Sequence, residues 1–236
     1  MTDPVRAAAA RLRGHLVATP VVGGAVLPGF ALPAGARLKL ECLQPGGTAM
    51  FRGYAHALLR SLGRFKGVVL HGDPRQIRAQ ACAAMAHRLP AVAVADAPLP
   101  ESLAQLLHEL GLEAVPGDPV EHAANRGFVV MPGCSDSDVL DGLATLGLEL
   151  ADELPLDTSR VLVAPSVLAA PVRRGLAAGG RDTPVAGVDR DPGVDFAALA
   201  GAVLDQLRVA SDPEGLAALW AGCHSTDEGL AVVLSC

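Results

Sequence analysis

The feature that most constrains the fold is an alternation of short apolar segments with helical ones. Segments rich in valine and alanine occupy residues 67–70, 91–95 and 113–116. Residues 79–88 and 100–110 lie between them and carry small and apolar side chains at helical spacing. Strands that alternate with helices pair in parallel, because each helix returns the chain to the same end of the sheet. The pattern therefore predicts an α/β protein with parallel sheets and flanking helices.

Another helix is expected near the start of the chain. Four apolar residues recur at helical spacing over residues 4–17, and Pro20 disfavours helix in the residue before it. The four are Val5, Ala8, Leu12 and Leu16.

Composition narrows the class of protein further. Half of the 236 residues are hydrophobic but only 3% are aromatic, so the core must consist of alanine, valine and leucine. The net charge of −6 argues against nucleic acid or an anionic membrane as a partner. No apolar run reaches the ~18 residues of a membrane span, and the N-terminal residues lack the form of a signal peptide. The five cysteines are odd in number and show no Cys-x-x-Cys spacing. We therefore expect a cytoplasmic protein with reduced thiols.

Residues 38–54, LKLECLQPGGTAMFRGY, are the most specific segment of the sequence. They predict a buried strand, a turn with proline and glycine, and the start of a helix. The segment resembles fold-type II pyridoxal-phosphate enzymes of the serine/threonine dehydratase and serine racemase group, whose pattern is LKLE-x-LQ-P-T-G-S-F-K-x-R-G-A. The positions that match in register are Leu38, Leu40, Glu41, Leu43, Gln44, Pro45, Gly47, Arg52 and Gly53.

This resemblance implies an architecture and a mode of association. It predicts a shortened form of the two-lobed tryptophan synthase β-like fold, with parallel sheets in both lobes. The large lobe would comprise residues 1–45 and 133–236, and the small lobe residues 46–132. Since these enzymes form dimers, we expect a homodimer or a dimer with a paralogue.

Met50 stands where the pattern has the lysine that holds the cofactor. That lysine amine binds pyridoxal phosphate as an imine and later moves protons at the substrate. Methionine has no amine and only a weak acceptor sulfur. The chain has only two lysines, Lys39 on the predicted strand and Lys66 in a polar loop. The family's reaction is therefore not expected here.

Two further cofactor contacts of the family also differ. Arg75 takes the place of the asparagine that binds the cofactor ring, and Pro74 replaces a loop glycine. Residues 164–171 occupy the position of a glycine-rich phosphate loop but contain no glycine. Such a loop needs backbone amides that close on the phosphate. Ser235, which matches the serine that bonds the pyridine nitrogen, is retained. We expect no cofactor.

The resemblance gathers several charged residues near the mouth of the old cleft. His71 and Asp73 could act as general acid and base without a cofactor. The arginines could bind an anionic or amino-acid-like ligand by charge-assisted hydrogen bonds. Alternatively, the segment is a solvated loop with internal salt bridges. The residues expected to bind such a ligand are Arg52, Arg75, Arg78 and Ser235.

Metal-ligand patterns are weak in this sequence. Asp189, Asp191 and Asp195 lie where some members of the family bind a divalent cation, but carboxylates in a solvated loop explain them as well. His108-Glu109 lacks the second histidine of a zinc motif. We expect no metal site.

Three functions follow as hypotheses. The first is a degenerate dehydratase-like protein that has lost pyridoxal phosphate and ammonia-lyase activity, and that binds a partner or an amino-acid-like or anionic ligand. The second is an enzyme of small-molecule biosynthesis that works without the cofactor through His71 and Asp73. The third is a residual pyridoxal-dependent lyase.

Overall fold

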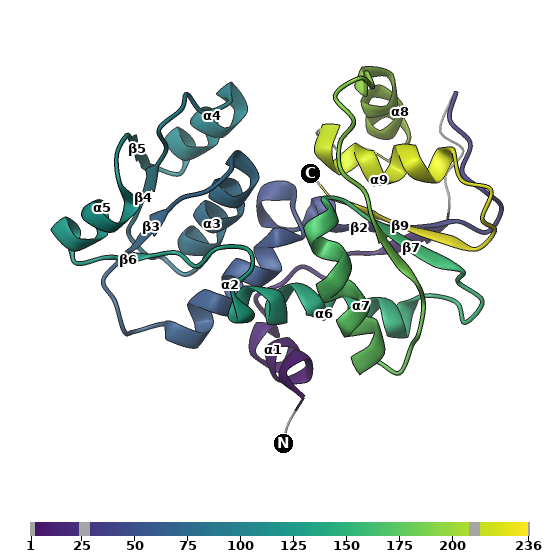
Figure 1. The fold of residues 1–236 in the computed structure, drawn as a ribbon, viewed down its shortest axis with the longest axis horizontal. Helices are drawn as coiled ribbons and strands as arrows, with labels where there is room; N and C mark the ends of the chain where they lie inside the picture. The colour runs from purple at the N-terminus through teal and green to yellow at the C-terminus, as the bar shows by residue number, and fades with distance from the viewer. Residues whose placement is uncertain (1–2, 24–28, 208–212, 236) are drawn as a thin grey trace. The chain divides into compact units, whose positions relative to one another are not determined.

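The computed structural model describes residues 3–23, 29–207 and 213–235, which form two compact units. Unit 1 comprises Met1–Ala49 and Leu143–Cys236, and unit 2 comprises Met50–Gly142. The sequence places the boundaries between the two lobes after residue 45 and after residue 132, and these boundaries stay a prediction. The α/β architecture with parallel sheets and flanking helices is confirmed in both units (Figure 1).

Unit 1 is built on a five-stranded sheet with the order β1-β2-β9-β7-β8. Only the pair of β1 and β2 is antiparallel; the other neighbours among the described strands are parallel. All five residues of β9 are buried, as expected for a central strand that is covered on both faces. The strands are β1 (Val21–Gly23), β2 (Arg37–Leu40), β7 (Arg160–Val163), β8 (Val185–Gly187) and β9 (Leu230–Leu234).

Helices cover both faces of this sheet, with α8 and α9 on one side and α6 and α7 on the other (Figure 1). No helix in the described ranges is long and apolar enough to cross a membrane. The elements are α1 (Pro4–Leu12), α6 (Ser137–Glu153), α7 (Ala169–Ala178), α8 (Ala197–Leu207), α9 (Pro213–Cys223) and the short 3-10 turns η1 (Glu41–Leu43), η2 (Pro45–Gly47) and η3 (Ser166–Leu168). The first six residues of α6 belong to unit 2.

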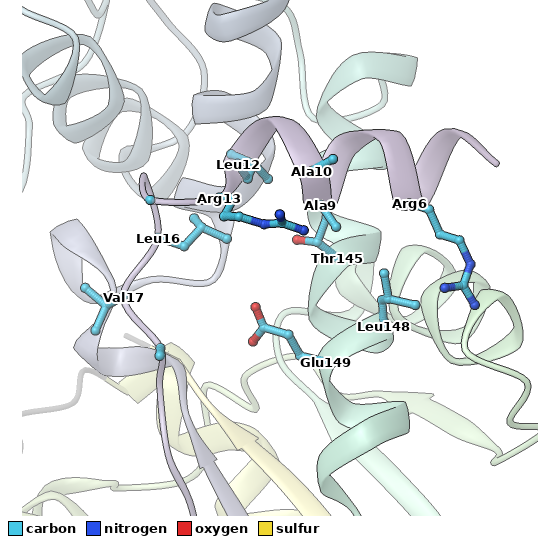
Figure 2. Close-up of a pocket in the computed structure, with 12 residues that line it drawn as sticks. Arg6, Ala9, Ala10, Leu12, Arg13, Leu16, Val17, Thr145, Leu148 and Glu149 are labelled. Atoms are coloured by element: carbon cyan, nitrogen blue, oxygen red, sulfur yellow. The ribbon is translucent and has the colours of Figure 1, made fainter. Parts of the chain in front are cut away.

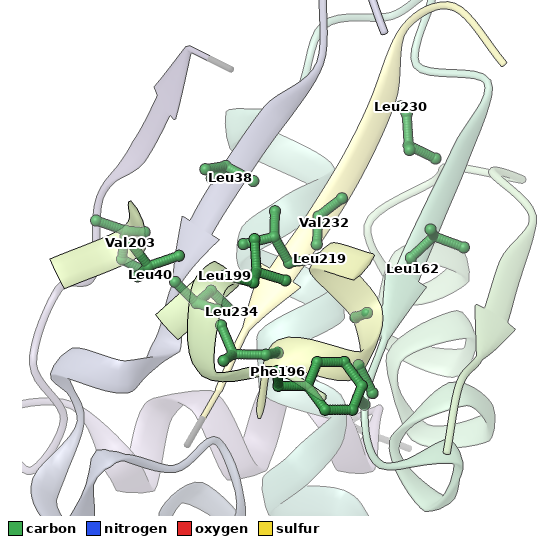
Figure 3. Close-up of a cluster of buried hydrophobic side chains, with 14 residues drawn as sticks. Leu38, Leu40, Leu162, Phe196, Leu199, Val203, Leu219, Leu230, Val232 and Leu234 are labelled. Atoms are coloured by element: carbon green, nitrogen blue, oxygen red, sulfur yellow. The ribbon is translucent and has the colours of Figure 1, made fainter. Parts of the chain in front are cut away.

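The core of unit 1 is aliphatic, as the composition predicts (Figure 3). Side chains from β2, β7 and β9 meet those of α8 and α9. Trp220 makes aromatic contacts with Phe30 and Phe196. Its ring centroid lies 6.1 Å from that of Phe30 and 6.0 Å from that of Phe196. The labelled members of the cluster are Leu38, Leu40, Leu162, Phe196, Leu199, Val203, Leu219, Leu230, Val232 and Leu234.

Two glycines bring α6 and α7 of unit 1 into backbone contact. A Cβ atom on Gly175 would lie 2.8 Å from the Cα of Gly147 and would overlap the carbonyl oxygen of Ala144. A Cβ atom on Gly147 would lie 2.8 Å from the backbone nitrogen of Leu176. Since real Cβ atoms are not found this close to backbone atoms, only glycine permits this crossing.

Unit 2 is built on a parallel four-stranded sheet with the order β5-β4-β3-β6. Asp73 and Asp118 accept hydrogen bonds from the first amides of α3 and α5, and each is followed by a proline, which suits the first position of a helix. The elements are α2 (Met50–Ser61), β3 (Val68–Leu70), α3 (Pro74–Ala86), β4 (Ala91–Val94), α4 (Glu101–Glu109), β5 (Glu113–Val115), α5 (Pro119–Arg126) and β6 (Val129–Val130).

Candidate functional site

Met50 is the first residue of α2 and has an exposed fraction of only 2%. The helix is buried almost continuously from Met50 to Leu58. Its buried residues include Arg52, whose side chain is engaged in interactions within the protein. A guanidinium is buried only where polar partners compensate it. Met50 is thus a packing residue, while ligand binding by Arg52 stays a prediction.

Neither lysine is placed to take over the role of the missing amine. The ammonium of Lys39 lies 2.7 Å from Glu153 and 3.2 Å from Glu149, and it donates to the carbonyl of Thr19 at 2.8 Å. Its side chain is 1% exposed. These three oxygen acceptors already engage the Lys39 amine, so it is not available to hold a cofactor. Lys66 is exposed in the loop between α2 and β3.

The loop between β7 and α7 does not fit a phosphate group. Pro165 has no amide hydrogen. The amide of Ser166 donates to Oδ1 of Asp189 at 2.9 Å, and that of Leu168 donates to the carbonyl of Pro165 at 3.0 Å. A phosphate needs free amides at a helix N-terminus. Here the amides of Ser166 and Leu168 already donate to acceptors within the chain, and the carboxylate of Asp189 would repel a second anion.

Ser235 directly follows β9 and connects two segments of unit 1. Its hydroxyl oxygen accepts a hydrogen bond from the amide of Ala49 at 3.0 Å, and its O–H group donates to the hydroxyl oxygen of Thr48 at 3.4 Å. The residue is 2% exposed. These bonds give Ser235 a structural role, and its role in ligand binding stays a prediction.

His71 and Asp73 follow β3 in unit 2, and each holds local structure. The Nε2 atom of His71 donates to the carbonyl of Met131 at 2.8 Å, which joins the ends of β3 and β6. The His71 backbone exchanges two hydrogen bonds with the Gln80 amide, at 2.9 and 3.0 Å. Asp73 caps α3 by accepting from the amides of Arg75 and Gln76. Catalysis by His71 and Asp73 stays a prediction that this geometry does not favour.

The structure brings Arg75, but not Arg78, to Asp73. The Nε atom of Arg75 lies 3.5 Å from Oδ1 of Asp73. Arg78 instead donates to the hydroxyl of Ser102 on α4 at 3.3 Å. Both arginines lie in unit 2, together with Arg52.

The three aspartates of the predicted cation site accept hydrogen bonds from backbone amides of unit 1. Asp191 accepts from the amide of Gly193 at 2.8 Å, and Asp195 from that of Ala197 at 2.9 Å. Asp189 accepts from Ser166, as described above. Within residues 3–23, 29–207 and 213–235, no three His, Cys, Asp or Glu side chains are grouped closely enough to hold a metal ion.

Tyr54, on α2 of unit 2, is a polar residue that sequence reasoning missed. It is fully buried, and its hydroxyl has no hydrogen-bond partner of good geometry among the described residues. Burial raises its pKa far above the usual value of about 10. The nearby Gln80 amide lowers it, and the charges of Cys134 and Asp73 add to the rise. The family pattern has alanine at this position, which is the one signal that could have marked Tyr54.

Because Tyr54 is the only tyrosine, its ionisation can be followed without overlap. The folded state keeps the phenol proton to higher pH than the unfolded state, so unfolding releases a proton above pH ~10. We therefore expect the free energy of unfolding to fall by up to ~1.4 kcal/mol per pH unit as the pH rises above 10. Below the ordinary pKa this contribution is constant. Denaturation titrations from pH 8 to 11 measure the slope, and Tyr54→Phe should lack this contribution. Tyrosinate absorbance from the folded protein near pH ~10 would contradict the prediction.

Comparison with known proteins identifies the fold. The sequence matches no protein-family model and no curated protein. Solved structures do match: maize serine racemase has a TM-score of 0.80 and 18% identity over 99% of this chain and 92% of the enzyme's chain. A pyridoxal 5'-phosphate-dependent aspartate racemase has a TM-score of 0.81 and 18% identity over 98% of this chain and 94% of that one. The chain has the fold of the fold-type II pyridoxal-phosphate enzymes.

The processed form of threonine deaminase isoform 2 from Solanum lycopersicum extends the same likeness. It has a TM-score of 0.74 and 17% identity, over 100% of this chain and 85% of its own. At these identities the likeness establishes the fold, which the segment at residues 38–54 predicts. The fold-type II architecture expected from the sequence is thereby confirmed.

Proposed function

We propose that this protein is a degenerate dehydratase-like protein that does not hold pyridoxal phosphate and acts by binding a partner or a small ligand. The observation that carries the proposal is the hydrogen bond from the Ser166 amide to Asp189 at 2.9 Å. The chain's own carboxylate thus binds the first amide of η3, the 3-10 turn that leads into α7, and an anion would be repelled from this loop.

The amine chemistry supports the same proposal. Met50 cannot form an imine, and the ammonium of Lys39 is held by two carboxylates and a carbonyl. Lys66 is exposed and distant in sequence from residue 50. Phosphate and imine contacts thus fail for independent physical reasons, so a single substitution would not restore both.

A cofactor-free enzyme built on His71 and Asp73 is the weaker alternative. Both side chains are used in structural hydrogen bonds, and no observation provides a substrate position next to them. Self-association, or association with a paralogue, remains part of the proposal as an expectation from the fold.

Addition of pyridoxal phosphate to the purified protein tests the proposal. We expect no saturable imine absorbance in the wild type, and no ketoacid from serine or threonine. The variant Met50→Lys should give at most weak, non-saturating imine formation. Each charge-assisted bond missing from the phosphate is worth roughly 1.5–3 kcal/mol, and ~1.4 kcal/mol is a factor of ten in affinity.

The exposed Lys66 is the expected source of non-specific imine, so the experiment is done in a Lys66→Arg background. A third variant combines Met50→Lys with Asp189→Gly, which removes the competing carboxylate. Tighter cofactor binding in this variant than in Met50→Lys alone would support the assigned role of Asp189. Tight binding or turnover by the wild type or by Met50→Lys would overturn the proposal.

A further inference from the structure

A hollow of about 480 Å³ lies in unit 1 between α1 and α6 (Figure 2). Its volume falls within the ~300–1,000 Å³ of small-molecule pockets. The walls are largely apolar, which is also typical of such pockets. They include Ala9 and Ala10 of α1, Leu16 and Val17 of the following segment, and Leu148 of α6.

The hollow exists because α1 ends early. The helix stops at Leu12, where the sequence pattern predicted that it would continue to residue 17. Arg13 adopts a non-helical conformation, and Gly14 has a φ of 81°, which turns the chain away from the helix axis. The segment that follows forms a separate wall, and alanines on α1 leave the space between the walls open.

Opposite charges face each other across the hollow. The side chain of Arg13 reaches into it from the end of α1, and the carboxylate of Glu149 points into it from α6 (Figure 2). Within the part of the chain that the structure describes, the Arg13 guanidinium takes part in no hydrogen bond or ion pair. Glu149 is 34% exposed and is held from the other side by the buried ammonium of Lys39 at 3.2 Å.

We propose that this hollow binds a zwitterionic α-amino acid with an aliphatic side chain. The ligand carboxylate pairs with Arg13, whose planar fork suits a carboxylate. The ligand ammonium pairs with Glu149, and the aliphatic side chain packs on Leu16 and Leu148. A fatty-acid anion has no ammonium to place beside Glu149, and an alkylamine has no carboxylate to pair with Arg13. Both should therefore bind more weakly than the zwitterion.

The proposal rests on a cavity that shares no residue with the cofactor contacts discussed above. Its outcome is therefore independent of whether the protein holds pyridoxal phosphate. Glu149 is set in place by Lys39 rather than by a mobile loop, so the anionic half of the site is preorganised.

Isothermal titration with four compounds tests the ligand class. L-leucine is the expected ligand, 4-methylpentanoate lacks its ammonium, 3-methylbutylamine lacks its carboxylate, and L-serine lacks its aliphatic side chain. We expect saturable binding of leucine, with each other compound at least ~10-fold weaker because a charge-assisted bond or the apolar contact is lost. Equal binding of 4-methylpentanoate would identify a simple anion site and overturn the proposal. So would the absence of leucine binding at millimolar concentration.

Variants locate the site. Arg13→Gln should weaken leucine binding at least ~10-fold, and Ala9→Phe should abolish it by filling the hollow. Arg11→Gln is the matched control, because Arg11 is an exposed arginine on the same helix that does not line the hollow. Circular dichroism of each variant verifies folding. Unchanged binding by folded Arg13→Gln and Ala9→Phe, or an equal loss in Arg11→Gln, would overturn the assignment.

Discussion

Gly175→Ala is expected to destabilise the protein by at least ~2 kcal/mol, against the usual effect of alanine in a helix. Alanine exceeds glycine in helix propensity by about 1 kcal/mol. At Gly175 the added methyl group meets the backbone of Ala144 and Gly147. Backbone atoms cannot rotate away as a side chain can, so α6 and α7 must separate and lose packing along their contact.

Gly201→Ala provides the matched control. Gly201 also lies within a helix, α8, but a Cβ atom there would have no heavy atom within 4 Å. This variant should gain about 0.5–1 kcal/mol in stability from helix propensity alone. Urea denaturation followed by fluorescence of Trp220, the only tryptophan, measures both changes. Effects of the same sign would show that the α6–α7 contact does not depend on glycine.

Lys39→Met is expected to lower the free energy of unfolding by about 3 kcal/mol, since it removes a buried cation from two carboxylates and a carbonyl oxygen. Breaking a buried ion pair costs about 3–5 kcal/mol. The lower end applies because Glu149 and Glu153 are 34% and 37% exposed, so water can partly solvate them. Methionine preserves most of the side-chain volume, which separates the loss of charge from the loss of packing.

Lys66→Met is the control for this prediction, because Lys66 is the only other lysine in the sequence and is exposed. Its substitution should change the free energy of unfolding by less than about 0.5 kcal/mol. Both variants are compared with the wild type by urea denaturation at neutral pH. A Lys39→Met effect as small as that of Lys66→Met would mean that the buried ammonium contributes little to stability.

The order of elements was predictable because it depends on local patterns. Alternating apolar and helical segments predict the parallel sheets, and the segment at residues 38–54 predicts the fold. The helix α5 was not foreseen, although Asp118-Pro119 is a recognised start signal. The apolar spacing predicts an N-terminal helix over residues 4–17, but α1 ends at Leu12. The spacing continues to Leu16 although Gly14 has already turned the chain.

Contacts of the candidate sites depended on tertiary structure and could not be predicted in the same way. The hydrogen bond between Ser166 and Asp189 requires β7 and β8 to be neighbours in register, so that the segment after one strand reaches the loop after the other. The hollow at Arg13 and Glu149 requires α1 to lie against α6. Tyr54 is marked in the sequence only by the alanine that the family pattern has at this position, and that signal does not show that the phenol is completely buried.

The carboxylate of Asp189 has a consequence for how this chain is maintained in a cell. A protein whose helix N-terminus is neutralised by a dissociable anion gains stability in proportion to the logarithm of that anion's concentration. Asp189 is covalently part of the chain, so its contribution at Ser166 is present at every concentration of small molecules. Under the proposed function, the free energy of unfolding of this protein should therefore not change with the concentration of pyridoxal phosphate.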